Sequence, residues 1–234
     1  TTKKEYKTIE EIEKDSLEYD SYISWSDQIW NPMPADFDWA YYLPFVKEGK
    51  KISYAASFGQ LAAIGNVDIQ SKIKKYLELY DWISVREKGS ADNVKMLIGR
   101  DAETVLDPTL LLSANEWDKV ASQEKQIQGE YIFLYTLFAT RELMDIAKYF
   151  SKIFGLKVVV SNFSNNIDVF NSFVKKYDCG PREFLWYIKN ASLILTSSFH
   201  GSVFSVIYQK PFFSIGGKDD ARINTLLELR GLSD

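Results

Sequence analysis

The chain contains one histidine, His200, and its neighbours are residue types that bind anions. It follows a run of hydroxyl residues, Thr196, Ser197 and Ser198, and it precedes Gly201. An imidazole exchanges a proton near neutral pH, while hydroxyls at a helix N-terminus bind phosphate or carboxylate groups. Two roles are open for His200. It can be a polar residue that completes a turn, or a residue that meets a substrate, with Ser197, Ser198 and Gly201 beside it.

A strand, turn and helix must position this histidine. Residues 193–195 are leucine and isoleucine, as in a strand that is buried on both faces of a sheet. Apolar residues recur at helical spacing from Phe199, and Pro211 ends that helix before the next apolar run, 212–215. Ligands of open α/β sheets bind beyond the carboxyl ends of strands. This position favours the substrate role for His200.

Three cationic side chains follow predicted strands in the same way. Arg86 comes directly after one strand, where its planar guanidinium can clamp a phosphate or carboxylate. Lys218 and Arg222 come after the strand that follows the His200 helix, which puts them at the same sheet edge as His200. The alternatives are a surface ion pair between Arg86 and Glu87, and solvated side chains for the other two.

The segment between Trp25 and Trp30 is too polar for a strand and rich in aromatic residues. Ser26, Asp27 and Gln28 can bind the hydroxyls of a sugar, and either tryptophan can stack on its ring. The alternative is a turn in which Asp27 caps a helix and the tryptophans pack. The two interpretations are equally supported by the residues.

Strands and helices alternate along the chain. The strand predicted at 51–56 runs into the small residues Ser57 and Gly59, which permit close approach of a ligand or a helix. The polar segment 113–129 contains no predicted strand, and we expect two α/β domains, at 1–115 and 128–234. The other predicted elements are helices at 3–18, 69–79, 91–97, 142–154, 180–188 and 223–229 and strands at 19–24, 82–85, 103–106, 131–135 and 157–160.

Composition excludes several classes of protein. The 234 residues are 46% hydrophobic and carry a net charge of −4, which gives no general attraction to nucleic acid. One cysteine, Cys179, allows no internal disulfide, and with one histidine it does not suit the usual zinc sites. No apolar run is long enough to span a bilayer, and no signal peptide is visible. We expect a cytoplasmic protein without a bound metal, for which peripheral membrane association stays open.

Six motifs in the chain resemble, in the same order, those of the polysaccharide pyruvyl transferase family. The resemblance extends from about residue 20 to the end of the chain. The motifs are Ser26-Asp27-Gln28-Ile29-Trp30-Asn31, Ser53-Tyr54-Ala55-Ala56-Ser57-Phe58-Gly59, Ser84-Val85-Arg86-Glu87-Lys88, Val105-Leu106-Asp107-Pro108-Thr109-Leu110-Leu111, Gly180-Pro181-Arg182-Glu183-Phe184-Leu185, and Thr196-Ser197-Ser198-Phe199-His200-Gly201 with Lys210-Pro211-Phe212.

The resemblance implies two Rossmann-like domains with parallel sheets, an α/β fold similar to GT-B glycosyltransferases. It implies transfer of a pyruvyl group from phosphoenolpyruvate to a sugar of a cell-surface or exopolysaccharide precursor, lipid-linked or not, to form a ketal. No cofactor is implied. His200 would be the general acid or would polarise the substrate, and Arg86, Lys218 and Arg222 would hold the phosphate and carboxylate.

The chain departs from the family pattern at two places. Trp25 stands where the family has a glycine, and the family's first strand and glycine-rich loop have no counterpart, so we expect an incomplete N-terminal domain. Two other functions are considered: a GT-B-type glycosyltransferase that uses a nucleotide sugar, and a carbohydrate-binding module without catalysis.

Overall fold

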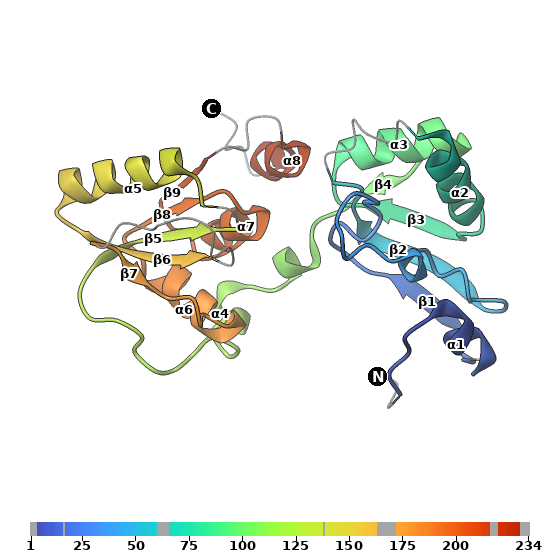
Figure 1. Ribbon diagram of the computed structural model, residues 1–234, viewed down its shortest axis with the longest axis horizontal. Helices are drawn as coiled ribbons and strands as arrows, with labels where there is room; N and C mark the ends of the chain where they lie inside the picture. The colour runs from blue at the N-terminus through green and yellow to red at the C-terminus, as the bar shows by residue number, and fades with distance from the viewer. Residues whose placement is uncertain are drawn as a thin grey trace. The chain divides into compact units, whose positions relative to one another are not determined.

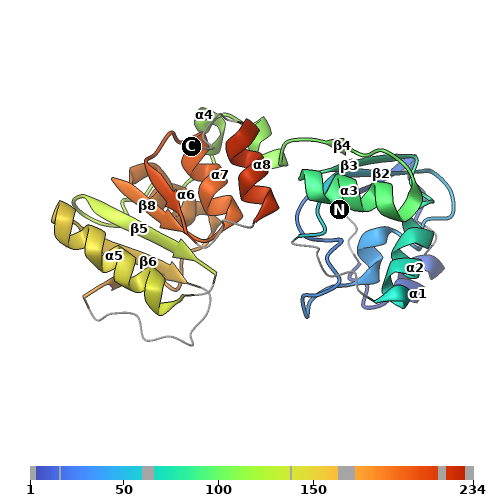
Figure 2. The same cartoon turned by 90° about the horizontal axis from the view of Figure 1, so that it is seen from above.

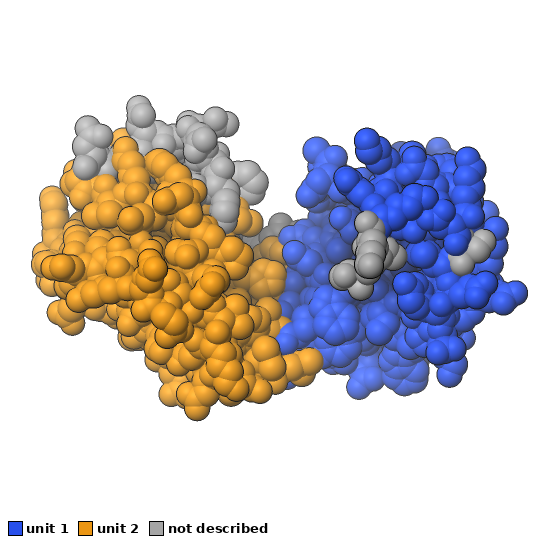
Figure 3. Space-filling model, turned by 90° about the horizontal axis from the view of Figure 1, so that it is seen from below, with its two compact units in different colours: residues 1–108 blue, residues 109–234 orange. Residues whose placement is uncertain are grey.

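The computed structural model describes residues 4–15, 17–59, 66–137, 139–162, 172–215 and 220–229. Its contacts divide the chain into two compact units, Thr1–Pro108 and Thr109–Asp234 (Figure 3). Residues 109–127, part of which the sequence indicates as a polar connection, belong to the second unit. Each unit contains one parallel sheet (Figure 1), so the predicted α/β fold with parallel sheets is confirmed.

The first unit has a four-stranded parallel sheet with strand order β1-β2-β3-β4. Its longer helices, α2 and α3, lie on the same side of the strands (Figure 2). The side chain of Asn66 caps α2, and α3 ends at Gly99, whose φ is +69°. The elements are α1 (Ile9–Lys14), β1 (Ser21–Ser24), η1 (Trp39–Tyr42), β2 (Lys50–Ala56), α2 (Val67–Leu77), β3 (Trp82–Val85), α3 (Lys88–Ile98) and β4 (Glu103–Thr104).

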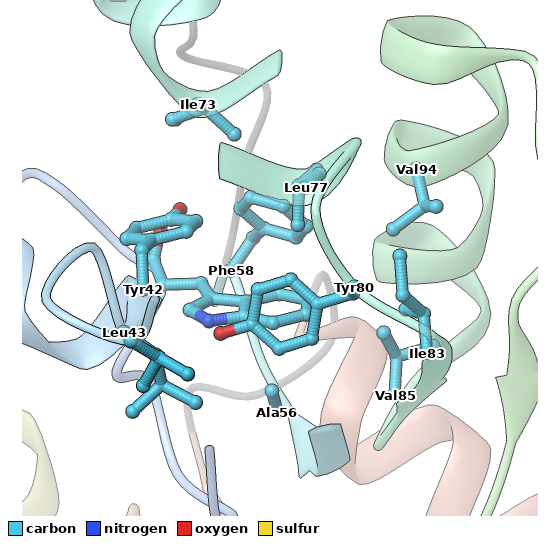
Figure 4. Close-up of a cluster of buried hydrophobic side chains, with 12 residues drawn as sticks. Tyr42, Leu43, Ala56, Phe58, Ile73, Leu77, Tyr80, Ile83, Val85 and Val94 are labelled. Carbon is cyan, nitrogen blue, oxygen red and sulfur yellow. The ribbon is translucent and has the colours of Figure 1, made fainter. Parts of the chain in front are cut away.

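Aromatic rings dominate the core of the first unit (Figure 4). Trp30 is fully buried and packs against three rings, with centroid distances of 5.5 Å to Tyr42, 5.3 Å to Phe58 and 5.5 Å to Tyr80. The hydroxyl of Tyr42 donates to the Trp30 carbonyl over 2.8 Å. Trp30 therefore anchors the polar segment that precedes it to the core of the unit.

The second unit has a five-stranded parallel sheet with strand order β7-β6-β5-β8-β9. Helices α5 and α6 lie on its opposite faces (Figure 1). The elements are η2 (Pro108–Leu111, which begins at the division between the units), α4 (Ala114–Trp117), β5 (Tyr131–Thr136), α5 (Arg141–Phe154), β6 (Lys157–Asn162), β7 (Val174–Lys175), α6 (Pro181–Asn190), β8 (Leu193–Thr196), α7 (Phe199–Ile207), β9 (Phe212–Ser214) and α8 (Ala221–Leu229).

Most predicted elements are present, and the exceptions are short. The helix predicted at 3–18 is limited to Ile9–Lys14 among the described residues, and the two-residue strand β7 was not predicted. The loop after Trp25 contains no helix for Asp27 to cap, so that part of the alternative interpretation is wrong. None of the described helices has the length and apolar character needed to cross a bilayer.

Candidate functional site

The carboxyl ends of the strands in the first unit gather one group of predicted residues. Ser26, Asp27 and Gln28 follow β1, Ser57 and Gly59 follow β2, and Arg86 follows β3. Parallel pairing of these strands brings the segments together, and Asp27 forms an isolated bridge with Ala56 at the end of β2. The structure therefore unites six of the predicted site residues at one sheet edge.

Arg86 is the centre of a buried charge network at this edge. Its side chain is 2% exposed and lies among three carboxylates, at 3.0 Å from Asp107, 3.4 Å from Asp27 and 3.7 Å from Glu87. Ser26 Oγ donates to the same Asp107 oxygen over 3.0 Å. The surface ion pair that we considered for Arg86 is instead a buried network. A phosphate would have to compete with these carboxylates for the guanidinium, and the clamping role of Arg86 stays a prediction.

Glu87 joins the ends of β2 and β3. Its carboxylate accepts hydrogen bonds from Ser57 Oγ, over 2.8 Å, and from Ser90 Oγ. The backbone N–H of Gly59 donates to Ser57 Oγ over 2.9 Å, and that of Phe58 donates to Ser90 Oγ over 3.1 Å. Because Ser57 is fully buried in these contacts, its hydroxyl holds the loop after β2 against α3.

Gly59 makes room for the loop after β1. Its φ is +69°, and a Cβ there would collide with the Gln28 side-chain oxygen and lie 2.8 Å from Asn31 Nδ2. Asn31 Nδ2 donates to Gln28 Oε1 over 2.9 Å, so the two amides form a lid over the glycine. The glycine is required here both for its backbone conformation and for space.

Asp27 combines an unusual backbone with an accessible side chain. Its φ is +85°, which is rare for a residue other than glycine. Its carbonyl accepts from the Ser57 N–H over 2.9 Å, and that contact fixes the backbone. The carboxylate is 62% exposed, unlike the buried Asp107 and Glu87. Asp27 is therefore the acid at this edge that can reach a ligand.

The carboxyl edge of the second unit is built from hydroxyls. Ser198 caps α7, and its Oγ accepts from the Gly201 N–H over 3.4 Å. Thr196 Oγ1 accepts from the Ser198 N–H over 3.0 Å, and Ser197 Oγ lies 2.6 Å from Thr136 Oγ1 at the end of β5. Ser197 is exposed, whereas Ser198 is buried. The predicted turn and helix start are thus present, with Ser197 as an exposed residue of the turn.

Gly201 allows α7 to approach β8 closely. A Cβ at this position would collide with Thr196 Oγ1 and lie 3.0 Å from Thr196 Cβ. The first turn of α7 therefore sits directly over the end of the strand, and this turn carries His200. His200 is half-buried, with its ring edge-to-face with Phe199 at a centroid distance of 5.2 Å.

Arg222 lies near this turn and is paired with an acid that sequence reasoning missed. Its Nε donates to Asp220 Oδ1 over 2.9 Å and its Nη2 to Asp220 Oδ2 over 2.5 Å. The guanidinium is 5.9 Å from the centre of the Phe199 ring. Burial raises the pKa of Asp220, but its hydrogen bonds with Arg222 outweigh this and leave it below the ordinary value. Lys218 lies outside the described residues.

Three other polar residues were not predicted for either edge, namely Asp107, Thr136 and Asp220. Glu87 was considered only as a surface ion-pair partner of Arg86, and it lies 3.7 Å from Arg86 in the buried network. Asp107 follows β4, and Thr136 is the last residue of β5. The rule that pointed to Arg86, a polar residue at the carboxyl end of a strand, would have included both. A partner that comes from a distant segment, as Asp107 does for Arg86, is not visible in the sequence. Across the described residues, no group of three or more histidine, cysteine, aspartate or glutamate side chains is arranged to hold a metal ion.

A cavity of about 940 Å³ opens at the other end of the first sheet. It is lined by α1 and by the segment 45–50, which precedes and begins β2. Its wall contains none of the predicted site residues, and both signs of charge are present, in Glu13 and Glu18 and in Lys47 and Lys50. The charged and hydroxyl side chains gathered at the carboxyl edge make that edge, and not the cavity, the candidate functional site.

Solved structures similar to this chain include UDP-GlcNAc 2-epimerases. The enzyme from Methanocaldococcus jannaschii, in complex with UDP-GlcNAc and UDP, has a TM-score of 0.59 at 16% identity, over 94% of this chain and 66% of that one. The enzyme from Neisseria meningitidis bound to UDP-GlcNAc has a TM-score of 0.60 at 12% identity, over 95% and 71%. That from Rickettsia bellii has a TM-score of 0.59 at 11% identity, over 88% and 59%.

At these identities the likeness shows the fold, which is GT-B-like. The chain spans roughly two thirds of the length of these structures. No protein of curated function matches the chain in sequence. The sequence does match the model of one family, polysaccharide pyruvyl transferase, over residues 2–219. This chain belongs to the polysaccharide pyruvyl transferase family.

Proposed function

We propose that the protein transfers the pyruvyl group of phosphoenolpyruvate to two hydroxyls of a saccharide, and that the product is a cyclic pyruvate ketal. The observation that carries the proposal is the turn 196–201, where the exposed Ser197 and the half-buried His200 flank the capped N-terminus of α7. A helix N-terminus with adjacent hydroxyls receives anions, and an imidazole can donate a proton.

The reaction needs a proton on the methylene carbon of the donor, the removal of the protons of two saccharide hydroxyls, and the departure of phosphate. In the proposal, His200 gives a proton to the methylene carbon of the donor, and positive charge develops at the carbon that carries the phosphate oxygen. One saccharide hydroxyl adds there, phosphate leaves with the electrons of its C–O bond, and the second hydroxyl closes the ketal. Of the two hydroxyl protons released, one restores the proton that His200 gave, and the other is taken up by the departing phosphate.

The donor anions require cationic or N–H groups around this turn. We assign them to the first amides of α7, to the Ser197 hydroxyl and to Arg222, with Lys218 as a further cation. Arg86 was predicted to share this role, but its carboxylate neighbours support a different one, which is to hold Asp27 and Asp107 in position. A reducing compartment suits the single cysteine, so the proposal includes a cytoplasmic reaction on a free, nucleotide-linked or lipid-linked saccharide.

Phosphate release from phosphoenolpyruvate tests the proposal. We expect release that depends on a saccharide from a panel of nucleotide-linked and lipid-linked sugars. His200→Ala should lower it by about 10²–10⁴-fold, the usual share of a general acid. Tyr149→Ala is the matched control, because this ring on α5 is 62% exposed; it should keep full activity. Circular dichroism checks that both variants are folded.

Other outcomes of this experiment identify the alternatives. Unchanged activity in His200→Ala would remove the catalytic assignment. Turnover of a nucleotide sugar without phosphoenolpyruvate would instead support a glycosyltransferase. Saccharide binding with no release, and no thermal stabilisation by phosphoenolpyruvate, would support a binding module.

A further inference from the structure

One face of the first sheet carries exposed apolar side chains. Ile23 pairs with Ile52, and Ile52 pairs with Trp82, so these three residues point to one face. Trp25 and Tyr54 lie two positions further along and share that face. Ile23 is 50% exposed, Trp25 54% and Trp82 57%, whereas the core and the helices α2 and α3 cover the opposite face.

Trp25 and Tyr54 form a stacked pair at the carboxyl end of this face. Their ring centres are 5.3 Å apart and their planes differ by 29°. Because Trp25 is 54% exposed while one side of its indole rests on Tyr54, the other side of the ring faces solvent. The structure thus separates the two tryptophans of this segment: Trp30 belongs to the core, and Trp25 presents a flat apolar surface.

Polar groups of the site adjoin this aromatic pair. Burial raises the pKa of Tyr54, and the negative charge of Asp107 adds to the increase, so the phenol lies within electrostatic reach of that carboxylate. Asp107 also binds Ser26, which follows Trp25 directly. The exposed Asp27 carboxylate comes one residue later. A flat ring surface and hydrogen-bond acceptors therefore lie side by side.

The charge of this edge selects among ligands. Within the described residues, the guanidinium of Arg86 lies among three carboxylates, and the exposed carboxylate of Asp27 offers acceptors to hydroxyl groups. A pyranose ring has an apolar face of C–H groups and a rim of hydroxyls. Stacking on an indole buries the apolar C–H face of the sugar, and the Asp27 carboxylate accepts hydrogen bonds from its hydroxyls.

We propose that the Trp25–Tyr54 pair is the stacking platform for a pyranose ring of the acceptor saccharide, with Asp27 accepting hydrogen bonds from its hydroxyls. The proposal rests on the proposed function for the identity of its ligand as an acceptor. It makes Trp25 a residue that determines acceptor specificity in this chain, at a position where a smaller residue would leave Tyr54 uncovered.

Nuclear magnetic resonance of the ¹⁵N-labelled indole groups tests this without any turnover. The probes are the methyl glycosides of galactose, glucose, mannose and N-acetylglucosamine, titrated one at a time. We expect at least one to shift the Trp25 resonance, which is assigned by its loss in Trp25→Phe. Trp25→Ala should weaken binding of that glycoside at least tenfold, and Asp27→Asn should weaken it as well.

Trp82→Ala is the matched control. Trp82 is as exposed as Trp25 and lies on the same face, but at the amino end of its strand. Its loss should leave glycoside binding unchanged. Equal losses in the two variants would overturn the proposal. So would concentration-dependent association of the protein that both variants abolish, since the face would then be a protein interface.

Two results separate this proposal from the proposed function. If phosphoenolpyruvate stabilises the protein and is turned over, but no glycoside shifts Trp25 and Trp25→Ala keeps its KM for the acceptor, the platform is wrong and the transferase stands. If a glycoside binds at Trp25 while phosphoenolpyruvate neither binds nor reacts, the platform stands and the transferase fails.

Discussion

The carboxyl edges of the two sheets have the same topology but opposite chemistry. In the first unit the edge is acidic, with Arg86 among the buried Glu87 and Asp107 and the exposed Asp27. In the second it consists of hydroxyls, a capped helix N-terminus and Arg222, which pairs with Asp220. An acidic edge suits hydroxyl donors, and a helix N-terminus suits anions. We infer that the first unit receives the saccharide and the second receives the anionic donor.

The two edges also use their ion pairs differently. In the first unit the ion pairs join segments up to 59 residues apart, from Asp27 to Arg86. At the carboxyl edge of the second unit, the ion pair between Asp220 and Arg222 joins residues only two apart in sequence. A network that links distant segments contributes to folding of the unit, whereas a local pair contributes to one helix start. Removing the Arg86 network should therefore lower the free energy of unfolding much more than removing the Asp220–Arg222 pair.

The largest effect is expected from Arg86→Met. The substitution removes the guanidinium that offsets the buried carboxylates of Asp107 and Glu87, which should cost about 3–5 kcal/mol of the free energy of unfolding. Hydrogen exchange during urea unfolding should show loss of protection in β2 and β3, with β5 and β6 little changed.

Arg141→Met is the matched control for Arg86. Arg141 pairs with Asp145 on the exposed side of α5, with the arginine side chain 74% exposed. Its removal should change stability by less than about 0.5 kcal/mol. If Arg86→Met were no more costly than this control, the charge network would not be what holds the first edge together.

A smaller effect is expected from Gly59→Ala, measured against Gly99→Ala. Both glycines have a φ of +69°, but nothing lies within 4 Å of a Cβ at Gly99. The backbone strain should cost each variant about 1 kcal/mol. Gly59→Ala should cost about 1–3 kcal/mol more, because its methyl group displaces the Gln28 amide. Urea unfolding, monitored by tryptophan fluorescence, measures the free energy of unfolding of both variants. Equal losses would show that the Gln28 amide moves aside at no cost in stability.

The sequence predicts local features of these edges better than long-range ones. The start of α7 is encoded within six residues, 196–201, so capping rules and the strand pattern were sufficient to find it. Glu87 is the sequence neighbour of Arg86, whereas Asp27 and Asp107 come from two other segments that the strand order brings beside it. The sequence therefore indicated a cation at the edge and one adjacent carboxylate, but not that Asp27 and Asp107 also surround it.

The two tryptophans of the loop after β1 make the same point about burial. Trp25 and Trp30 are five residues apart in a polar segment, and either could have been the exposed ring. Trp30 is buried because Tyr42, Phe58 and Tyr80 converge on it from other parts of the unit. Which aromatic residue is available to a ligand is thus set by tertiary packing, which periodicity does not report.

The smallest effect, and the one that tests the second edge, is expected from Asp220→Asn. The asparagine can still accept the hydrogen bond that Arg222 N–H donates to Asp220 over 3.0 Å, so the start of α8 should be kept. Loss of the charge pair should cost about 1 kcal/mol at neutral pH.

This cost should depend on pH in one direction. The pKa of Asp220 in the folded protein lies below its ordinary value of 3.8. The carboxylate therefore stabilises the fold above the unfolded-state pKa, and this contribution is lost as pH falls through the folded-state pKa. Thermal unfolding of the wild type and Asp220→Asn should differ most at neutral pH and converge in acid. A difference that grows in acid would mean that the carboxylate does not stabilise the pair with Arg222.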